Sequence, residues 1–299
     1  MSTSLILTTT SSFSYTTENI VQNPFKRKLT EEELIELLKK YNPEILIAGV
    51  EPITEKAMSA SPNLRVIARV GVGLDNVDLI AAQKKNIEVL NTPDAVTAPV
   101  AELTLGLMLS LLRKIYTSHA SILQKKWDRP MGSLLKGKTV GIMGAGRIGK
   151  YVANLVNAFG ADVLIYDPFS SIYSYSTENN IESFASKADI VTLHMPLTSE
   201  NKEILNEKFF SMLKKGSYIL NTSRGELVNE NDLYKALVSG KISGAALDVY
   251  NQEPYTGKLT ELENVLLTAH IGSYAKEARN EMEKQAFENA INYLKKIQK

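Results

Sequence analysis

A glycine-rich turn between two apolar runs constrains the fold of this 299-residue chain more than any other feature. The turn has the pattern GxGxxG at residues 144–149 and directly follows an apolar run at 139–143. A helix-compatible segment comes next, and a second apolar run at 162–166 ends on Asp167. Strand, glycine turn, helix, strand and acid in this order predict a βαβ unit that binds a dinucleotide.

Each glycine of the motif has its own physical role. Gly144 permits the tight turn, Gly146 lets the backbone approach the pyrophosphate, and Gly149 lets the helix lie close to the sheet. The helix N-terminus then offers backbone N–H groups and the positive end of its dipole to the phosphates. Arg147 and Ile148 lie between the last two glycines, and we predict all five residues as cofactor-binding.

Asp167 indicates which dinucleotide is bound. A carboxylate at the end of the second strand accepts hydrogen bonds from the adenosine ribose hydroxyls and repels a 2′-phosphate. The residues that follow are Pro168 and Phe169, and neither carries the positive charge that a 2′-phosphate requires. We therefore expect NAD rather than NADP, although a carboxylate before a proline is also a common turn residue.

Composition indicates an ordinary globular protein. The chain is 44% hydrophobic and carries a formal net charge of +1, which gives no reason to expect nucleic acid or membrane partners. There is no cysteine, so disulfides and thiol chemistry are excluded. The N-terminus lacks the pattern of a signal peptide, and the longest apolar segment is too short for a bilayer. We expect a cytoplasmic enzyme without a metal site.

Two alternating series of strands and helices predict two α/β domains with doubly wound parallel sheets. The first series has strands at 5–7, 45–48, 66–68 and 87–90, and helices that begin near Thr30, at 54–58 and at 76–85. A longer helix at about 99–119 leads into the second series. Its six strands lie near Val140, Val163, Ile190, Tyr218, Ala245 and Val265, and one helix from about 275 ends the chain.

Three polar residues follow successive strands of the second series, where ligands bind in open α/β sheets. Arg224 offers a planar fork to a carboxylate, and His270 can deliver a proton near neutral pH. Glu253 supplies a carboxylate that stabilises the protonated imidazole. The alternative interpretation is structural: Arg224 is also typical of an exposed loop, and Glu253, which precedes a proline, of a simple turn. His194 also follows a strand, and spacing alone does not decide between it and His270.

The chain resembles the D-isomer-specific 2-hydroxyacid dehydrogenase family over nearly its whole length. The matching segments are residues 69–78, 91–93, 101–102, 127, 137–149, 193–198, 221–225, 246–254 and 268–273. The resemblance implies a Rossmann-type NAD-binding domain at 96–282. This domain is inserted into a flavodoxin-like substrate domain made of 1–95 and 283–299. It also implies a homodimer built on about 99–136, and a small 2-hydroxy or 2-keto acid as substrate.

The resemblance also implies residue roles. Arg224 corresponds to the carboxylate binder and carbonyl polariser, His270 to the general acid/base, and Glu253 to its partner. The backbone at Val72 and Gly73 corresponds to the substrate-carboxylate loop. The positions that resemble further cofactor contacts are His194, Pro196, Thr222, Asp248 and Ser273.

Within the family the chain is most similar to short forms of D-3-phosphoglycerate dehydrogenase, and Arg69 matches that subgroup as a substrate-binding residue. Gly49, however, stands where the subgroup tends to place a second phosphate-binding arginine, and the basic run at 26–28 is the alternative. The substrate therefore stays open, and glyoxylate or hydroxypyruvate reduction is an alternative. A different class of function, an NAD-sensing protein similar to a transcriptional corepressor, also has this fold.

Overall fold

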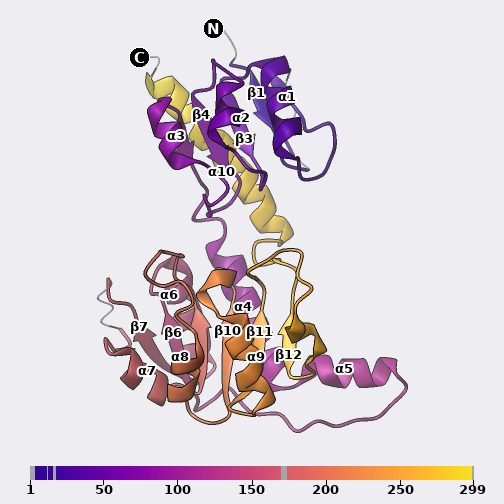
Figure 1. Ribbon diagram of the computed structural model, residues 1–299, viewed down its shortest axis with the longest axis vertical. Helices are drawn as coiled ribbons and strands as arrows, with labels where there is room; N and C mark the ends of the chain where they lie inside the picture. The colour runs from indigo at the N-terminus through magenta and orange to yellow at the C-terminus, as the bar shows by residue number, and fades with distance from the viewer. Residues whose placement is uncertain (1–3, 12, 16–17, 170–173, 298–299) are drawn as a thin grey trace. The chain divides into compact units, whose positions relative to one another are not determined.

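The computed structural model describes residues 4–11, 13–15, 18–169 and 174–297, and it divides the chain into two compact units. Unit 1 comprises Met1–Val96 and Ser273–Lys299, and unit 2 comprises Thr97–Gly272. Each unit is a parallel sheet with helices on both faces (Figure 1). This confirms the predicted α/β fold class.

The sheet of unit 1 has the order β2-β1-β3-β4-β5, and its neighbouring strands all pair in parallel. Its strands are β1 (Ile6–Thr8), β2 (Ile20–Val21), β3 (Ile45–Ala48), β4 (Val66–Arg69) and β5 (Glu88–Leu90). Because all the strands run in one direction, their carboxyl ends share one edge of the sheet. The loops after β1, β3, β4 and β5 therefore lie along that edge.

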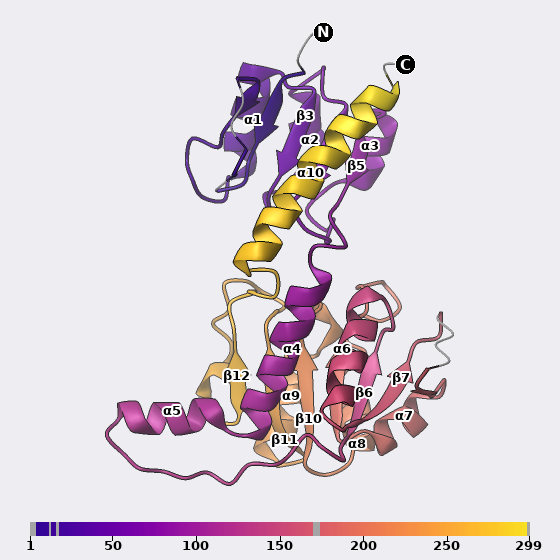
Figure 2. The same ribbon diagram turned by 180° about the vertical axis from the view of Figure 1, so that it is seen from behind.

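Three short helices cover one face of this sheet, and one long helix covers the other (Figure 2). They are α1 (Glu31–Tyr41), α2 (Glu55–Ser59) and α3 (Leu79–Lys84) on the first face, and α10 (Lys276–Ile297) on the second. Thr30 and Glu33 form a capping box that starts α1, which buries an apolar stripe that includes Leu34 and Leu38. No helix in the described part of the chain is both long and apolar enough to cross a bilayer.

The sheet of unit 2 has the order β12-β11-β10-β9-β6-β7-β8, and its neighbouring strands also pair in parallel. Its strands are β6 (Thr139–Met143), β7 (Asp162–Tyr166), β8 (Ser176–Thr177), β9 (Ile190–Leu193), β10 (Ser217–Asn221), β11 (Ile242–Leu247) and β12 (Val265–Leu267). The chain starts at β6, winds outward to β8, and then returns to place β9 on the other side of β6. This reversal is the topological switch point at which doubly wound sheets bind dinucleotides.

Helices α4 (Thr97–Leu112) and α6 (Arg147–Ala158) cover one face of this sheet, and α7 (Ile181–Lys187), α8 (Glu207–Met212) and α9 (Glu230–Val238) cover the other. The remaining helices are α5 (Ile115–Leu123) and the 3₁₀ turns η1 (Gly225–Leu227) and η2 (Lys258–Glu261). The core of the first face includes Met108 and Val152, and the second includes Phe184, Phe209 and Phe210. Burial on both faces explains why these strands read as continuous apolar runs.

The structure corrects three features of the predicted secondary structure. The helix expected at 99–119 is two helices, because Lys114 adopts a left-handed conformation (φ 51°) between α4 and α5. The helix expected at 76–85 begins only at Leu79, since Asp78 is its N-cap and accepts a hydrogen bond from the Ala81 N–H. Strands β2 and β8 were not predicted, because two residues carry no periodic signal.

The second domain boundary also differs from the expected one. The predicted boundary at 282–283 would cut through α10, which is one continuous helix and packs on β3, β4 and β5 of unit 1. The compact units instead divide after Gly272, and the first boundary falls after Val96 rather than after residue 95. Ser273, predicted to contact the cofactor, consequently belongs to unit 1.

Candidate active site

The turn between β6 and α6 can be built only with glycine at two of its positions. Gly144 has φ +98°, and a Cβ atom there would lie 2.5 Å from the His194 carbonyl oxygen at the end of β9. A Cβ atom on Gly149 would overlap the Gly144 carbonyl oxygen. The helix therefore starts directly against the two central strands of the sheet.

Gly146 has a different surrounding, which fits a phosphate-bearing cofactor. A Cβ atom on this residue would meet no heavy atom within 4 Å, so the space in front of the helix is open. Gly146 is also the N-cap of α6 and gives no side-chain cap. Six other helices are capped by a Thr, Asp or Asn side chain. The positive end of α6 is thus left for an anion from outside the chain.

The end of β7 is joined to the glycine turn through Asp167. One carboxylate oxygen, Oδ2, accepts a hydrogen bond from the Ala145 N–H at 2.7 Å, and Oδ1 accepts one from the Phe169 N–H at 2.9 Å. The carboxylate is half-buried beside the turn. The two bonds hold the Asp167 carboxylate where we expect it to accept hydrogen bonds from the ribose hydroxyls.

A matched pair of glycine substitutions tests this assignment. We expect Gly146→Ala to weaken NADH binding at least about tenfold, since the new methyl group enters the open space at the helix N-terminus. Its free energy of unfolding is expected to fall by about 1 kcal/mol at most. Gly144→Ala is expected to lower the free energy of unfolding by about 3 kcal/mol or more, because residue 144 has a positive φ and the new methyl group would clash with the His194 backbone. Fluorescence titration and urea unfolding measure both quantities, and unchanged NADH affinity in Gly146→Ala would contradict the assignment.

His194, the competitor for the catalytic role, lies in surroundings that do not suit a proton donor. Its Nε2 atom is 3.0 Å from the Thr192 hydroxyl, and within the described residues its buried Nδ1 atom has no hydrogen-bond partner. Burial lowers the pKa of His194 to about 3. The imidazole is therefore neutral at physiological pH.

The lowered pKa of His194 gives an expected pH dependence of stability. Between pH 6.5 and about 3 the unfolded chain protonates this imidazole and the folded chain does not. The free energy of unfolding therefore falls as the pH drops through this window. When the pH is lowered from 7 to 4.5, the free energy of unfolding of His194→Asn is expected to fall less than that of the original protein. Urea titrations at the two pH values measure this difference. His119→Asn, which changes an exposed histidine, is the control. Equal losses in all three proteins would argue against a neutral buried His194.

Arg224 lies in a tight turn after β10. The Asn221 side chain closes this turn, because its Oδ1 accepts from the Ser223 N–H at 3.0 Å and its Nδ2 donates to the Arg224 carbonyl at 2.7 Å. A Cβ atom on Gly225 would overlap the Tyr250 backbone, so the turn packs directly against the segment after β11. The Arg224 guanidinium donates to the Ser223 carbonyl through Nη1 at 2.8 Å.

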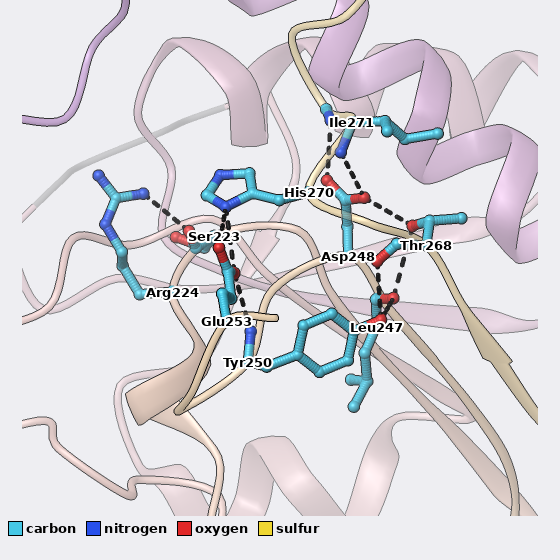
Figure 3. A network of polar contacts seen from close by, with 10 residues as sticks. Ser223, Arg224, Leu247, Asp248, Tyr250, Glu253, Thr268, His270 and Ile271 are labelled. Carbon is cyan, nitrogen blue, oxygen red and sulfur yellow. Dashed lines mark hydrogen bonds and ion pairs between the residues drawn. The ribbon is translucent and has the colours of Figure 1, made fainter. Parts of the chain in front are cut away.

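Glu253 and His270 form a direct pair (Figure 3). The His270 Nδ1 atom lies 2.9 Å from Glu253 Oε2 and 3.1 Å from Oε1. The side chain of His270 is 53% exposed and that of Glu253 is 39% exposed, so the imidazole remains accessible to a small molecule. Since β10, β11 and β12 are neighbours in the sheet, Arg224, Glu253 and His270 follow three adjacent strand ends.

Asp248 holds the turn that carries His270. Its carboxylate is buried and accepts hydrogen bonds from the Thr268 hydroxyl (2.6 Å) and from the N–H groups of Ile271 and Gly272 (both 2.8 Å). His270 lies between these contacts with a left-handed backbone (φ 52°). The sequence suggested only a cofactor contact for Asp248, because the partners of a carboxylate cannot be read from its position after a strand.

Tyr250 is a structural member of the site that the sequence reasoning missed. Its hydroxyl lies 3.0 Å from the Leu247 carbonyl and 2.7 Å from the Thr268 carbonyl, and its backbone N–H donates to Glu253 at 3.3 Å (Figure 3). Burial raises the pKa of the Tyr250 phenol above its usual range, so the hydroxyl keeps its proton. The only signal in the sequence was its place between Asp248 and Glu253.

The remaining predicted residues divide between the two units. In unit 2, Thr222 is buried and its hydroxyl lies 2.9 Å from that of Thr104, whereas Pro196 is exposed after β9. The predicted substrate residues Arg69, Val72 and Gly73 lie in unit 1, at the end of β4 and in the loop after it. Among the described residues, no group of three or more His, Asp or Glu side chains could hold a metal ion.

Comparison with known proteins identifies both the domain and the family. Residues 105–272 match the family model described as the NAD-binding domain of D-isomer specific 2-hydroxyacid dehydrogenases. This match covers most of unit 2, including the glycine turn and the Arg224, Glu253 and His270 positions. Unit 2 is therefore an NAD-binding domain, as its topology predicted.

Individual relatives extend the match into unit 1. The chain is 40% identical over 259 residues to D-3-phosphoglycerate dehydrogenase of Methanocaldococcus jannaschii, covering 84% of this chain but only 49% of that relative. It is 38% identical over 271 residues to hydroxypyruvate reductase of Thermotoga maritima, covering 87% and 89% of the two chains. The crystal structure of the TT0316 protein from Thermus thermophilus superposes with a TM-score of 0.89 at 32% identity, covering 97% and 96%. The chain spans about half the length of the first relative, and it belongs to the D-isomer specific 2-hydroxyacid dehydrogenase family.

Proposed function

We propose that the protein is an NAD-dependent dehydrogenase that interconverts a 2-keto acid and the corresponding D-2-hydroxy acid. The observation that carries this proposal is the hydrogen-bonded pair of His270 and Glu253. The pair follows strands next to the one that carries Arg224, in an NAD-binding domain. A proton donor, its anionic partner and a carboxylate-binding cation are the groups that reduction of a 2-keto acid requires.

The chain's own residues have separate tasks in this reaction. Arg224 binds the substrate carboxylate with its planar guanidinium and polarises the adjacent carbonyl group. Bound NADH supplies the hydride for the carbonyl carbon. His270 donates the proton to the carbonyl oxygen from Nε2, because its Nδ1 is bonded to Glu253. Glu253 fixes the orientation of the ring through its contact with Nδ1.

Most of the residues proposed to hold the cofactor belong to unit 2. The glycine turn and the N-terminus of α6 bind the pyrophosphate. Asp167 accepts hydrogen bonds from the ribose hydroxyls and disfavours binding of a 2′-phosphate. His194, Pro196, Thr222 and Asp248 lie after other strands of this sheet and line the rest of the cofactor site. Unit 1 serves as the substrate domain, with Arg69, Val72 and Gly73 as substrate-binding residues and Ser273 as a further cofactor contact.

A substrate panel tests the proposal against the alternative of an NAD-sensing binding protein. NADH oxidation is followed at 340 nm with 3-phosphohydroxypyruvate, hydroxypyruvate, glyoxylate, pyruvate and a branched 2-keto acid. Turnover of at least one compound is expected. Silence across the panel, combined with NADH-dependent self-association, would favour the binding protein.

We further propose that the protein forms a homodimer through α5 and the segment after it. This region exposes large apolar side chains: Ile115, Ile122, Leu123, Trp127, Met131 and Leu134. Exposed apolar patches of this kind mark protein–protein contacts. Sedimentation equilibrium tests the dimer.

We also propose a cytoplasmic location, which fits a chain without cysteine and is tested by cell fractionation.

A further inference from the structure

Tyr250 bonds to both members of the His270–Glu253 pair, directly or through the backbone. Its N–H donates to Glu253 Oε1 at 3.3 Å, and this oxygen also lies 3.1 Å from His270 Nδ1. Its phenol hydroxyl lies 2.7 Å from the carbonyl oxygen of Thr268, two residues before His270 (Figure 3). One residue is therefore hydrogen-bonded both to the carboxylate of the pair and to the backbone that carries the imidazole.

The Tyr250 hydroxyl joins the carboxyl ends of β11 and β12. It lies 3.0 Å from the carbonyl of Leu247, the last residue of β11, and the Thr268 N–H, directly after β12, donates to the same carbonyl at 3.0 Å. Because both neighbours of the hydroxyl are carbonyl oxygens, the phenol acts as the donor. Burial, together with the Asp248 carboxylate, raises the pKa of the Tyr250 phenol above its usual range, so this donor is present throughout the pH range of an assay.

The turn that carries His270 is held on both sides. Its left-handed backbone (φ 52°) is unfavourable for a residue with a Cβ atom, so the conformation depends on its surroundings. Asp248 accepts hydrogen bonds from the two backbone N–H groups that follow His270. Tyr250 donates to the Thr268 carbonyl on the preceding side. The direction of the imidazole therefore depends on both contacts.

The remaining contacts of Tyr250 give its hydroxyl a defined position. The residue is 7% exposed, and its ring stacks on that of Tyr255 with the ring centroids 4.3 Å apart. A Cβ atom on Gly225 would overlap the Tyr250 carbonyl group, so this backbone packs against the turn that carries Arg224. Tyr250 thus lies among the strand ends that the three proposed catalytic residues follow.

From these contacts we propose that Tyr250 is a positioning residue for proton transfer, and that its hydroxyl sets the direction in which the His270 ring points. The inference rests on the proposed function, in which His270 donates a proton from Nε2. Tyr250 acts through the Thr268 backbone and through Glu253 rather than on the substrate. Its effect on the rate follows because misplacement of a reacting group by about 1 Å can cost about 10²-fold.

The first test is Tyr250→Phe, which removes the hydroxyl and keeps the ring and the backbone contacts. We expect kcat for the best 2-keto acid to fall about tenfold, because the His270 turn loses one of its two anchors. KM for the acid and the dissociation constant for NADH are expected to stay within about twofold, since Arg224 and the glycine turn are unchanged. Tyr255→Phe, which removes the hydroxyl of the stacked neighbour, is the matched control and should leave kcat unchanged. An unchanged kcat in Tyr250→Phe, or an equal loss in Tyr255→Phe, would overturn the proposal.

The tautomer of the His270 ring gives a second measurement that needs no turnover. A carboxylate only accepts hydrogen bonds, so in the neutral ring the contact with Glu253 favours the proton on Nδ1. The chain has three histidines, so 15N NMR of histidine-labelled protein can follow each ring at alkaline pH. Tyr250→Phe is expected to move the His270 population toward the proton on Nε2 and to leave His119 and His194 unchanged. An unchanged His270 tautomer would contradict the positioning role.

A donor restored at the same place keeps the proposal testable if Tyr250→Phe does not fold. The amino acid p-aminophenylalanine, introduced at position 250 by amber-codon suppression, has an N–H group for each of the two carbonyl oxygens. It is expected to keep kcat within about threefold of the original, and a larger loss would argue against hydrogen bonding as the role of this residue. If the original protein reduces no 2-keto acid, the proposed function fails, whereas the 15N spectra still test the positioning of His270. The two failures are therefore distinguishable.

Discussion

Replacing His270 by glutamine is expected to lower kcat by about 10³-fold, since general acid catalysis contributes about 10² to 10⁴-fold. Glutamine keeps a polar side chain of similar reach but cannot deliver a proton from a protonated ring. The His270–Glu253 contact lies on the exposed side of the strand ends, so the fold is expected to survive the change. Steady-state NADH oxidation with the best 2-keto acid measures the effect.

The accompanying NADH affinity separates loss of chemistry from loss of structure. The dissociation constant for NADH is expected to stay within about threefold of the original, because the glycine turn and Asp167 are untouched. His119→Gln alters an exposed histidine of α5 and should behave as the original protein does. Near-normal turnover in His270→Gln would remove this residue from the reaction and return His194 to consideration.

Replacing Arg224 by alanine is expected to affect binding and turnover together. Loss of the charged fork should raise KM for the 2-keto acid about tenfold or more, and loss of carbonyl polarisation should lower kcat about 10²-fold. An effect on both parameters follows because one guanidinium serves the ground state and the transition state. Initial-rate kinetics over a wide substrate range separate the two parameters.

Arg113→Ala, which removes an exposed arginine just after α4, is the matched control and should change neither parameter. Arg224→Lys is informative as well. Lysine retains the charge but loses the planar fork, so an intermediate loss is expected. An unchanged KM in Arg224→Ala would argue against a carboxylate as the group bound at this position.

Much of the fold follows from local sequence because its main elements carry strong periodic and turn signals. The βαβ unit around the glycine motif is an example, since Gly144 has a positive φ and a Cβ atom on Gly149 would overlap the Gly144 carbonyl oxygen. The break at Lys114 was missed because nothing in its neighbourhood resembles a helix-breaking residue. The two-residue strands β2 and β8 depend on pairing with distant segments, which local sequence does not encode.

The candidate site shows the same division. Position after a strand singled out Arg224, Glu253 and His270, because parallel strands bring their carboxyl ends to one edge. The supporting contacts were not foreseeable. The bonds of Asp248 to the 268–272 turn join residues that are 20 to 24 positions apart, and in unit 1 Glu51 reaches Thr9 across 42 positions. Such pairings depend on strand order and register, which appear only in the folded chain.

The most direct test of the proposed reaction is the fate of a deuterium label. The protein is incubated with NADH deuterated at the transferable C4 position and with the best 2-keto acid, and the product is analysed by chiral chromatography and mass spectrometry. We expect the D-2-hydroxy acid with one deuterium on C2. An L-configured product, or no labelled 2-hydroxy acid in the presence of bound NADH, would contradict the proposed function.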